Sequence, residues 1–322
     1  MNTFEEQSHR VIGKYIIERE LGCGGFATVF LGREVKTNEL HALKVIDRQL
    51  ATSNDIIVYV EHELRIMARL NHPNIAKVHD IIYTEEYIMI VMEFMEISDL
   101  NTLLNNQYCF KNADKIRIAC ELLDAINYIH ERGICHRDIK PANIMFDRDL
   151  HPKIIDFGFC REKGQNLSTY CGTELFMAPE IICGKSYDGQ KADIWAFGVT
   201  IHALATNQVP FDYANEALLI NDIKNNQLRI DIKAQGLLGW ICKNSLQINP
   251  DERLTAAQML DYAKGQLEFE TLQPCLHHCA IRRANTNTTM PKIRFQINTP
   301  VIIRARIGNI NYKKRRQIRS LE

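Results

Sequence analysis

The chain contains 322 residues, of which 46% are hydrophobic and 24% are charged. A chain of this kind can bury a large core, and no run approaches the roughly eighteen apolar residues of a membrane span, which excludes a protein built on membrane helices. The formal net charge of zero hides an asymmetry, because residues 264–322 contain twelve Lys or Arg against three Asp or Glu.

Apolar and polar residues alternate over residues 15–19 and 28–31, and this pattern predicts two strands. The segment between them contains Gly22, Gly24 and Gly25. Glycines let backbone N–H groups approach phosphates closely, but such a segment is equally common in a hairpin turn, so both interpretations stay open at this point. The chain has no G-x-x-x-x-G-K-[ST] pattern, which argues against a P-loop enzyme.

A third strand is predicted over residues 41–46 and contains Lys44. Residues 55–70 then predict a helix of about four turns. Two glutamates, Glu61 and Glu63, interrupt equally apolar faces of this helix. A carboxylate that faces the core is costly unless it is paired with a cation, and Lys44 is the candidate partner. Periodicity alone does not choose between the two glutamates.

Three longer elements follow. Residues 87–93 predict a strand, and residues 114–131 predict an amphipathic helix that ends at Gly133. Residues 191–205 predict a helix that is apolar nearly all round, as expected of a helix buried within a lobe. Asp193 is the carboxylate that this helix would bury.

Two short motifs carry the chemistry. The first reads His-Arg-Asp-Ile-Lys-Pro-Ala-Asn at residues 136–143, and the second reads Asp-Phe-Gly from Asp156. Mg²⁺ prefers carboxylate and amide oxygens, which Asp156 and Asn143 can supply. Asp138 is then free to orient a substrate hydroxyl and take its proton, while Lys140 offsets the charge of a transferred phosphate. A lone Asp in a loop more often caps backbone amides, but both motifs in this order favour phosphoryl transfer.

Together these motifs resemble the catalytic loop and the metal-binding motif of eukaryotic-type serine/threonine protein kinases. The resemblance covers residues 11–263 and implies an α+β fold of two lobes. The N-lobe, about residues 11–95, would be small and β-rich with one main helix, and the C-lobe, about residues 96–263, would be larger and helical. Residues 1–10 and 264–322 are expected to be terminal extensions. The implied activity is transfer of the γ-phosphate of ATP, with Mg²⁺, to Ser or Thr of protein substrates.

The resemblance also assigns the nucleotide site. It selects Glu63 as the partner of Lys44, because the family's helix glutamate lies nine residues before the histidine at position 72. Met92 becomes the gatekeeper, the next residues form a hinge whose backbone binds adenine, and Asp99 is expected to bind the ribose. Ala27 stands where the family's third loop glycine is usual. The residues expected to bind the nucleotide and its metal are Leu21, Gly22, Gly24, Gly25, Val29, Ala42, Lys44, Glu63, Met92, Glu93, Met95, Asp99, Asn143, Met145 and Asp156.

Regulation is expected in the segment that follows the Asp-Phe-Gly motif. Arg137 needs a counter-anion, and a phosphate on Thr169 would supply one through charge-assisted hydrogen bonds. Ser168 is the neighbouring candidate, and either an upstream kinase or trans-autophosphorylation would add the phosphate. The alternative, that these hydroxyls only cap turns, stays open. Lys140 together with Thr173 resembles serine/threonine rather than tyrosine kinases.

Two further contacts are implied as structural ones. Asp193 would hold the backbone of the catalytic loop, and Arg253 would pair with Glu180. The subfamily stays open, because the glycine-rich segment and the Lys44 strand are similar to calcium/calmodulin-dependent, polo-like and autophagy-type kinases alike. The competing hypothesis is a pseudokinase, which binds nucleotide or partners without turnover, although the residues whose loss usually marks that class are all present.

The C-terminal extension resembles no family. Residues 293–297 and 301–307 hint at strands, and the basic cluster at 313–319 suits a solvated tail, an acidic partner, nuclear import or docking into the kinase cleft. We expect no direct contact with nucleic acid. The ten cysteines are spread singly, apart from the Cys-Leu-His-His-Cys run at 275–279, whose ligands are too crowded for one tetrahedral ion. This pattern, with no signal peptide at the N-terminus, favours free thiols and a cytoplasmic or nuclear location.

Overall fold

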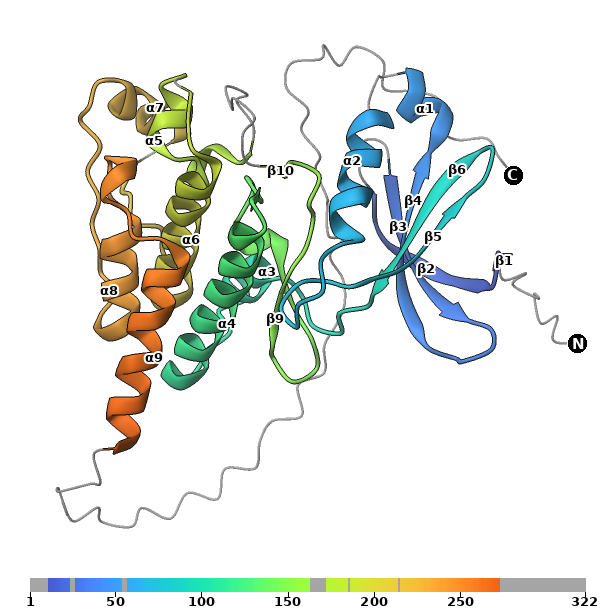
Figure 1. Ribbon diagram of the computed structural model, residues 1–322, viewed down its shortest axis with the longest axis horizontal. Coiled ribbons are helices and arrows are strands. Elements are labelled where there is room, and N and C mark those ends of the chain that lie inside the picture. Colours follow the sequence, from blue (N-terminus) through green and yellow to red (C-terminus); the bar gives the residue numbers. More distant parts are fainter. Residues whose placement is uncertain are drawn as a thin grey trace, which may run out of the picture.

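The computed structural model shows two lobes, one built on a β-sheet and the other on helices (Figure 1). The α+β, two-lobe fold expected from the sequence is therefore confirmed. The structure describes residues 11–23, 27–53, 57–162, 172–184, 186–213 and 215–272.

The N-lobe is organised around an antiparallel sheet of six strands in the order β1-β2-β3-β4-β6-β5. The strands are β1 (Val11–Ile12), β2 (Tyr15–Cys23), β3 (Ala27–Glu34), β4 (Leu40–Asp47), β5 (Val78–Tyr83) and β6 (Tyr87–Glu93). β2 and β3 are longer than predicted, because backbone hydrogen bonding extends past the short alternating stretches of the sequence. β4 lies at the centre of the sheet and pairs Lys44 with Ile90 of β6.

Each face of this sheet has its own apolar cluster. Helices α1 (Arg48–Ser53) and α2 (Ile57–Met67) pack on one face, where Val60 and Leu64 of α2 meet Ile46, Ile88 and Ile90 of the sheet. The opposite face is covered by a second cluster that contains Tyr15, Leu43 and Met89. Because successive residues of a strand point to opposite faces, Leu43 and Lys44 are directed to different sides, and Lys44 faces α2.

The C-lobe contains the helices α3 (Leu100–Asn105), α4 (Asn112–Glu131), α5 (Pro179–Ile182), α6 (Gly189–Thr206), α7 (Glu216–Lys224), α8 (Gly236–Ser245) and α9 (Ala256–Leu272). α6 is buried along nearly its whole length, as its apolar sequence predicts. The side chain of Asp188 caps its first turn, and Asn207 ends it in the left-handed conformation at φ 59°. α9 continues past residue 263, so this helix crosses the boundary expected for the C-terminal extension.

Four short strands position the two chemical motifs: β7 (Ile134–Cys135), β8 (Ile144–Phe146), β9 (Pro152–Ile154) and β10 (Arg161–Glu162). The loop at 136–143 connects β7 to β8, and the Asp-Phe-Gly segment connects β9 to β10. Because β8 pairs with β9 and β7 pairs with β10, the two motifs are brought side by side. Among the described residues, no helix combines the length and the apolar character needed to cross a membrane.

Candidate active site

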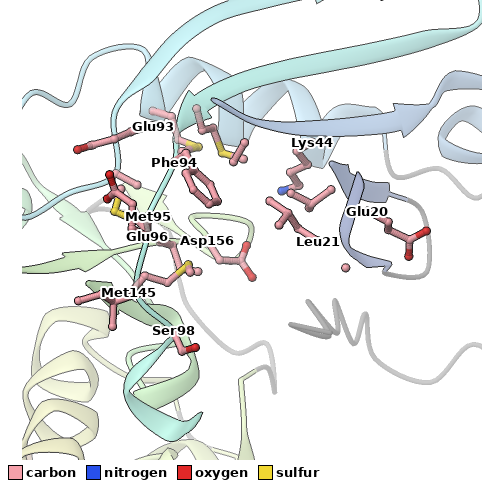
Figure 2. A pocket seen from close by; sticks show the side chains of 18 of the residues that line it. Glu20, Leu21, Lys44, Glu93, Phe94, Met95, Glu96, Ser98, Met145 and Asp156 are labelled. Atoms are coloured by element: carbon pink, nitrogen blue, oxygen red, sulfur yellow. The ribbon is translucent and has the colours of Figure 1, made fainter. Parts of the chain in front are cut away.

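A cavity of about 650 Å³ lies between the sheet of the N-lobe and the C-lobe (Figure 2). Most of the residues expected to bind the nucleotide line it: Leu21, Gly22, Val29, Ala42, Lys44, Glu63, Met92, Glu93, Met95, Met145 and Asp156. The side chains of Lys44 and Asp156 extend into this space from opposite lobes (Figure 2). Gly24 and Gly25 lie outside the described residues.

Several lining residues were not expected from the sequence. Glu96 and Ser98 line the cavity just after β6. Met67, the last residue of α2, and Ala76, in the segment that follows this helix, also line it. The signal for Met67 was available, because the apolar face of α2 that contains Glu63 also contains Met67. Glu96 was expected only as part of the hinge backbone, and Ser98 carried no signal beyond its position next to the predicted hinge.

Asp99 does not line the cavity in the structure. It precedes α3 and is 5% exposed. Its Oδ1 accepts the Thr102 backbone N–H at 2.9 Å, and its Oδ2 accepts the Thr102 hydroxyl at 2.7 Å. Both carboxylate oxygens therefore cap the helix, and Ser98 and Glu96 are the polar side chains at this end of the cavity.

Lys44 and Glu63 form the ion pair that the sequence predicts. The Lys44 Nζ donates to the Glu63 Oε1 at 2.8 Å. Glu63 is 6% exposed, whereas Glu61 is exposed, so the structure settles the choice that helical periodicity left open. Burial by itself lowers the pKa of Lys44, but the negative charges of Glu63 and Asp156 and the hydrogen bond to Glu63 outweigh it, and the net pKa is raised. The amine is consequently charged at neutral pH.

The catalytic-loop side chains form one hydrogen-bonded cluster. Lys140 Nζ donates to Asp138 Oδ2 at 2.7 Å and to the Thr173 hydroxyl at 2.8 Å. Asn143 Nδ2 donates to the backbone oxygen of Asp138 at 2.8 Å and to its Oδ2 at 2.9 Å. Among the described residues, the other carboxylate oxygen of Asp138, Oδ1, has one hydrogen-bonding neighbour, the Thr173 hydroxyl at 3.5 Å. Ile155, which lines the cavity, donates its backbone N–H to the backbone oxygen of Asn143. This hydrogen bond connects the cluster to the cavity wall.

Asp156 adopts the left-handed backbone conformation at φ 63°, and its Oδ1 accepts the Gly158 N–H at 3.3 Å. The next residue, Phe157, is fully buried against the ring of His136, with the ring centroids 4.8 Å apart. The buried phenyl ring thus fixes the segment so that the carboxylate of Asp156 faces the cavity. The oxygens of Asp156 and of the Asn143 amide, whose nitrogen is engaged by Asp138, are the type of ligand atom that Mg²⁺ prefers.

Asp193 holds the backbone of the catalytic loop, as the resemblance implies. Its Oδ2 accepts the His136 N–H at 2.8 Å, and its Oδ1 accepts the Arg137 N–H at 2.7 Å. No feature of the sequence indicated a third partner, His130, whose Nε2 lies 3.0 Å from Asp193 Oδ2. Asp193 is 1% exposed, so this carboxylate acts as a fully buried anchor.

Arg253 and Glu180 also pair as expected. The guanidinium donates two parallel hydrogen bonds of 2.7 Å to the two oxygens of Glu180, and it also donates to backbone oxygens of the neighbouring segments. Arg137 Nε donates to the Tyr187 hydroxyl at 3.1 Å. The predicted phosphorylation sites, Ser168 and Thr169, lie outside the described residues, as does the Cys-Leu-His-His-Cys run at 275–279.

The comparisons with known proteins agree with this geometry. The family model of the protein kinase domain matches residues 15–263. The chain is 36% identical over 251 residues to CBL-interacting serine/threonine-protein kinase 21 of Arabidopsis thaliana. The aligned region covers 77% of this chain and 60% of the relative. It is 32% identical over 270 residues to CBL-interacting protein kinase 30 of Oryza sativa subsp. japonica. This aligned region covers 81% of this chain and 56% of the relative. Each match thus spans less than two thirds of the relative's own length. Together with the two-lobe fold, the family model shows that the chain belongs to the protein kinase family.

Proposed function

We propose that this protein is an ATP-dependent serine/threonine kinase that transfers the γ-phosphate of ATP to hydroxyl groups of protein substrates. The observation that carries the proposal is the hydrogen-bonded cluster of Asp138, Lys140 and Thr173, which Asn143 connects to Ile155 in the wall of the cavity between the lobes. A carboxylate, an amine and a hydroxyl placed in this way can orient a substrate hydroxyl and offset the charge of a phosphoryl group.

The cavity supports a nucleotide in the expected orientation. Val29 and Ala42 from the sheet and Met145 from the C-lobe line it with apolar side chains, which suits the faces of a purine. Backbone groups of the hinge at Glu93 and Met95 would bind the purine edge. The phosphates would lie toward Lys44, whose charge is secured by its ion pair.

The donor set suits a divalent metal that accompanies the nucleotide. Asn143 and Asp156 would hold Mg²⁺ through their side-chain oxygens, because hard cations select oxygen ligands. When bound, the ion would neutralise phosphate charge. Lys44 would contribute a further positive charge from the N-lobe side.

The two oxygens of Asp138 differ in what they can do. Oδ2 already accepts hydrogen bonds from Lys140 and Asn143, whereas Oδ1, in the part of the chain that the structure describes, has just the Thr173 hydroxyl at 3.5 Å. We therefore assign to Oδ1 the hydrogen bond from the substrate hydroxyl and the acceptance of its proton. Lys140 would remain on Oδ2 and face the transferred phosphoryl group.

The preference for Ser and Thr rests on the contact between Lys140 and Thr173 and on the Arabidopsis thaliana relative, which is described as a serine/threonine-protein kinase. The similarity to those relatives lies within the kinase domain. We propose no narrower group and no specific partner, and we keep the calcium/calmodulin-dependent, polo-like and autophagy-type groups as open alternatives.

The test is to incubate the purified chain with ATP, Mg²⁺ and a degenerate array of Ser, Thr and Tyr peptides. We expect phosphate on Ser and Thr peptides, with activity lost in Asp138→Asn. If the wild-type chain binds nucleotide but transfers no phosphate above the level of Asp138→Asn, the proposal is wrong and the pseudokinase hypothesis replaces it.

Activation by a phosphate on Thr169 belongs to the same proposal. Arg137 lies directly before the catalytic aspartate, and a phosphate near its guanidinium would order the segment through charge-assisted hydrogen bonds. Thr169→Ala should lower activity strongly, and Ser168→Ala serves as the neighbouring comparison. Full activity of Thr169→Ala without phosphate on the segment would reject this mechanism.

We also propose the domain limits 11–263 for the kinase and 264–322 for a basic extension, with α9 running across the boundary. An acidic partner, or the kinase cleft itself, would be the contact of this extension. Truncation after residue 272, where the described helix ends, should raise activity on a peptide substrate if the extension inhibits the kinase. A cytoplasmic or nuclear location fits the free cysteines among the described residues.

A further inference from the structure

The hairpin between β3 and β4 gathers three side chains with metal-binding atoms away from the cavity. Glu34 ends β3, and its backbone N–H donates to the oxygen of Glu39 at 2.9 Å, so these two residues lie opposite each other. His41 follows two positions after Glu39 and points to the same side of the strand. One nitrogen or oxygen atom of each of the three side chains lies within 4.8 Å of the others. None of the three lines the cavity.

His41 is the decisive member of this group. It is 5% exposed, and neither of its ring nitrogens has a hydrogen-bond partner among the described residues. Its Nε2 lies 3.8 Å from Glu34 Oε2, which is too long for a hydrogen bond but directs the nitrogen toward the carboxylate. A buried imidazole without a partner is costly and rare, and a ligand between its nitrogen and the carboxylate would remove that cost.

The surroundings hold the imidazole in place. The rings of Tyr15 and His79 meet the His41 ring edge-on, with centroids 5.5 and 5.2 Å away. The Thr37 hydroxyl donates to Glu34 Oε2 at 3.0 Å, and Lys14 Nζ lies 3.0 Å from Glu34 Oε1. Both carboxylate oxygens of Glu34 are therefore positioned by neighbours, as the outer contacts of a metal site usually position its ligands.

Charge also favours a cation at this place. Like charges directly opposite each other in a hairpin repel, and Glu34 and Glu39 form such a pair. Lys14 balances one of the two carboxylates, and Glu39 has no ion pair among the described residues. The group therefore keeps an excess negative charge beside the imidazole nitrogen of His41.

We propose that Glu34, Glu39 and His41 form a binding site for a divalent transition-metal ion, and that Zn²⁺ is the ion it suits best. One imidazole nitrogen and two carboxylate oxygens are common zinc ligands, whereas an all-oxygen set would suit Mg²⁺. Ligand atoms of a tetrahedral zinc site are about 3.3 Å apart, from metal–ligand bonds of about 2.0 Å. To reach that spacing, the exposed Glu39 side chain would move inward, and His41 Nε2 and Glu34 Oε2, now 3.8 Å apart, would approach each other by about 0.5 Å, with water as the fourth ligand.

The experiment is a calorimetric titration of the full chain with Zn²⁺ in excess Mg²⁺. Cys275→Ser and Cys279→Ser are introduced first, to remove the thiols of the C-terminal run. We expect one site that is lost in His41→Gln and at least tenfold weaker in Glu39→Gln. Glu85→Gln, an exposed acidic position in another hairpin of the same sheet, is the matched control and should bind as the parent does.

Two further measurements keep the test decisive. Co²⁺ should give visible absorption without thiolate charge transfer, and at one Zn²⁺ concentration the melting temperature of the parent and of Glu85→Gln should rise more than that of Glu39→Gln. If His41→Gln does not fold, Glu39→Gln decides, because that side chain is exposed. Undiminished Zn²⁺ affinity in Glu39→Gln, or no Zn²⁺ binding by the parent, would overturn the proposal.

Discussion

The hydroxyl of Thr173 is the most direct test of the catalytic cluster. In Thr173→Ala the side chain keeps its Cβ but loses the oxygen that accepts a hydrogen bond from Lys140 Nζ at 2.8 Å. Lys140 then keeps only its contact with Asp138 Oδ2 at 2.7 Å. We expect kcat to fall, because the amine is no longer held between the two groups when charge develops on the transferred phosphoryl group.

The size of the effect follows from the two hydrogen bonds of this hydroxyl. A hydrogen bond with a charged donor contributes about 1.5–3 kcal/mol, whereas the contact with Asp138 Oδ1, at 3.5 Å, is too long to count for much. The Lys140 side chain is 17% exposed, so water replaces part of the lost bond. We therefore take the lower end, about 1.5 kcal/mol, which corresponds to roughly a tenfold lower kcat.

The assay compares kcat and KM of wild type, Thr173→Ala and Thr173→Ser on one peptide substrate with saturating ATP and Mg²⁺. Thr173→Ser keeps the hydroxyl and should stay within about threefold of wild type, since only a methyl group is removed. A kcat of Thr173→Ala within twofold of wild type would refute the reasoning. Equal losses in both variants would assign the effect to packing of the methyl group.

Three other expectations concern the ion pairs and the thiols. Glu63→Gln should lower kcat/KM for ATP by roughly ten- to a hundredfold, because the ion pair holds the Lys44 amine in place. It should also reduce the pKa of Lys44, because the charge of Glu63 raises that pKa. Steady-state kinetics measures the first effect, and NMR of the labelled lysine measures the second. Glu180→Gln should cost about 3–5 kcal/mol in urea unfolding, since it leaves the fully buried guanidinium of Arg253 without its anion, and a loss below about 1 kcal/mol would contradict this. Burial raises the pKa of four thiols among the described residues, Cys120 and three that are buried, so iodoacetamide should label the exposed cysteines first in the native chain, as peptide mass spectrometry would show. The thiols expected to stay unlabelled are Cys135, Cys160 and Cys242.

The sequence was most informative where a motif is local. The loop at 136–143 and the segment from Asp156 could be interpreted because their chemistry depends on side chains a few residues apart. The choice between Glu61 and Glu63 shows the limit of periodicity, since both interrupt an apolar face. Only the packing of α2 on the sheet, which leaves Glu61 exposed, determines which carboxylate meets Lys44.

What the sequence missed depends on contacts between distant segments. The ribose contact expected of Asp99 is not among these and stays a prediction, since the hydrogen bonds of this carboxylate to Thr102 are local. His130 contacts Asp193 from 63 residues away, and no periodicity announces such a pair. The burial of His41 depends likewise on Tyr15 and His79, which reach it from other strands.

The position of Asp193, near the N-terminal end of α6, explains why a carboxylate rather than an amide is needed there. Arg137 has a positive φ of 68°, a conformation that costs an ordinary residue about 1 kcal/mol or more and persists only where neighbours enforce it. Both oxygens of Asp193 accept hydrogen bonds, one from the Arg137 N–H and the other from the His136 N–H. An amide has a single acceptor oxygen and would direct N–H groups toward one of these donors. The buried carboxylate therefore enforces the strained turn that directly precedes the catalytic aspartate, Asp138.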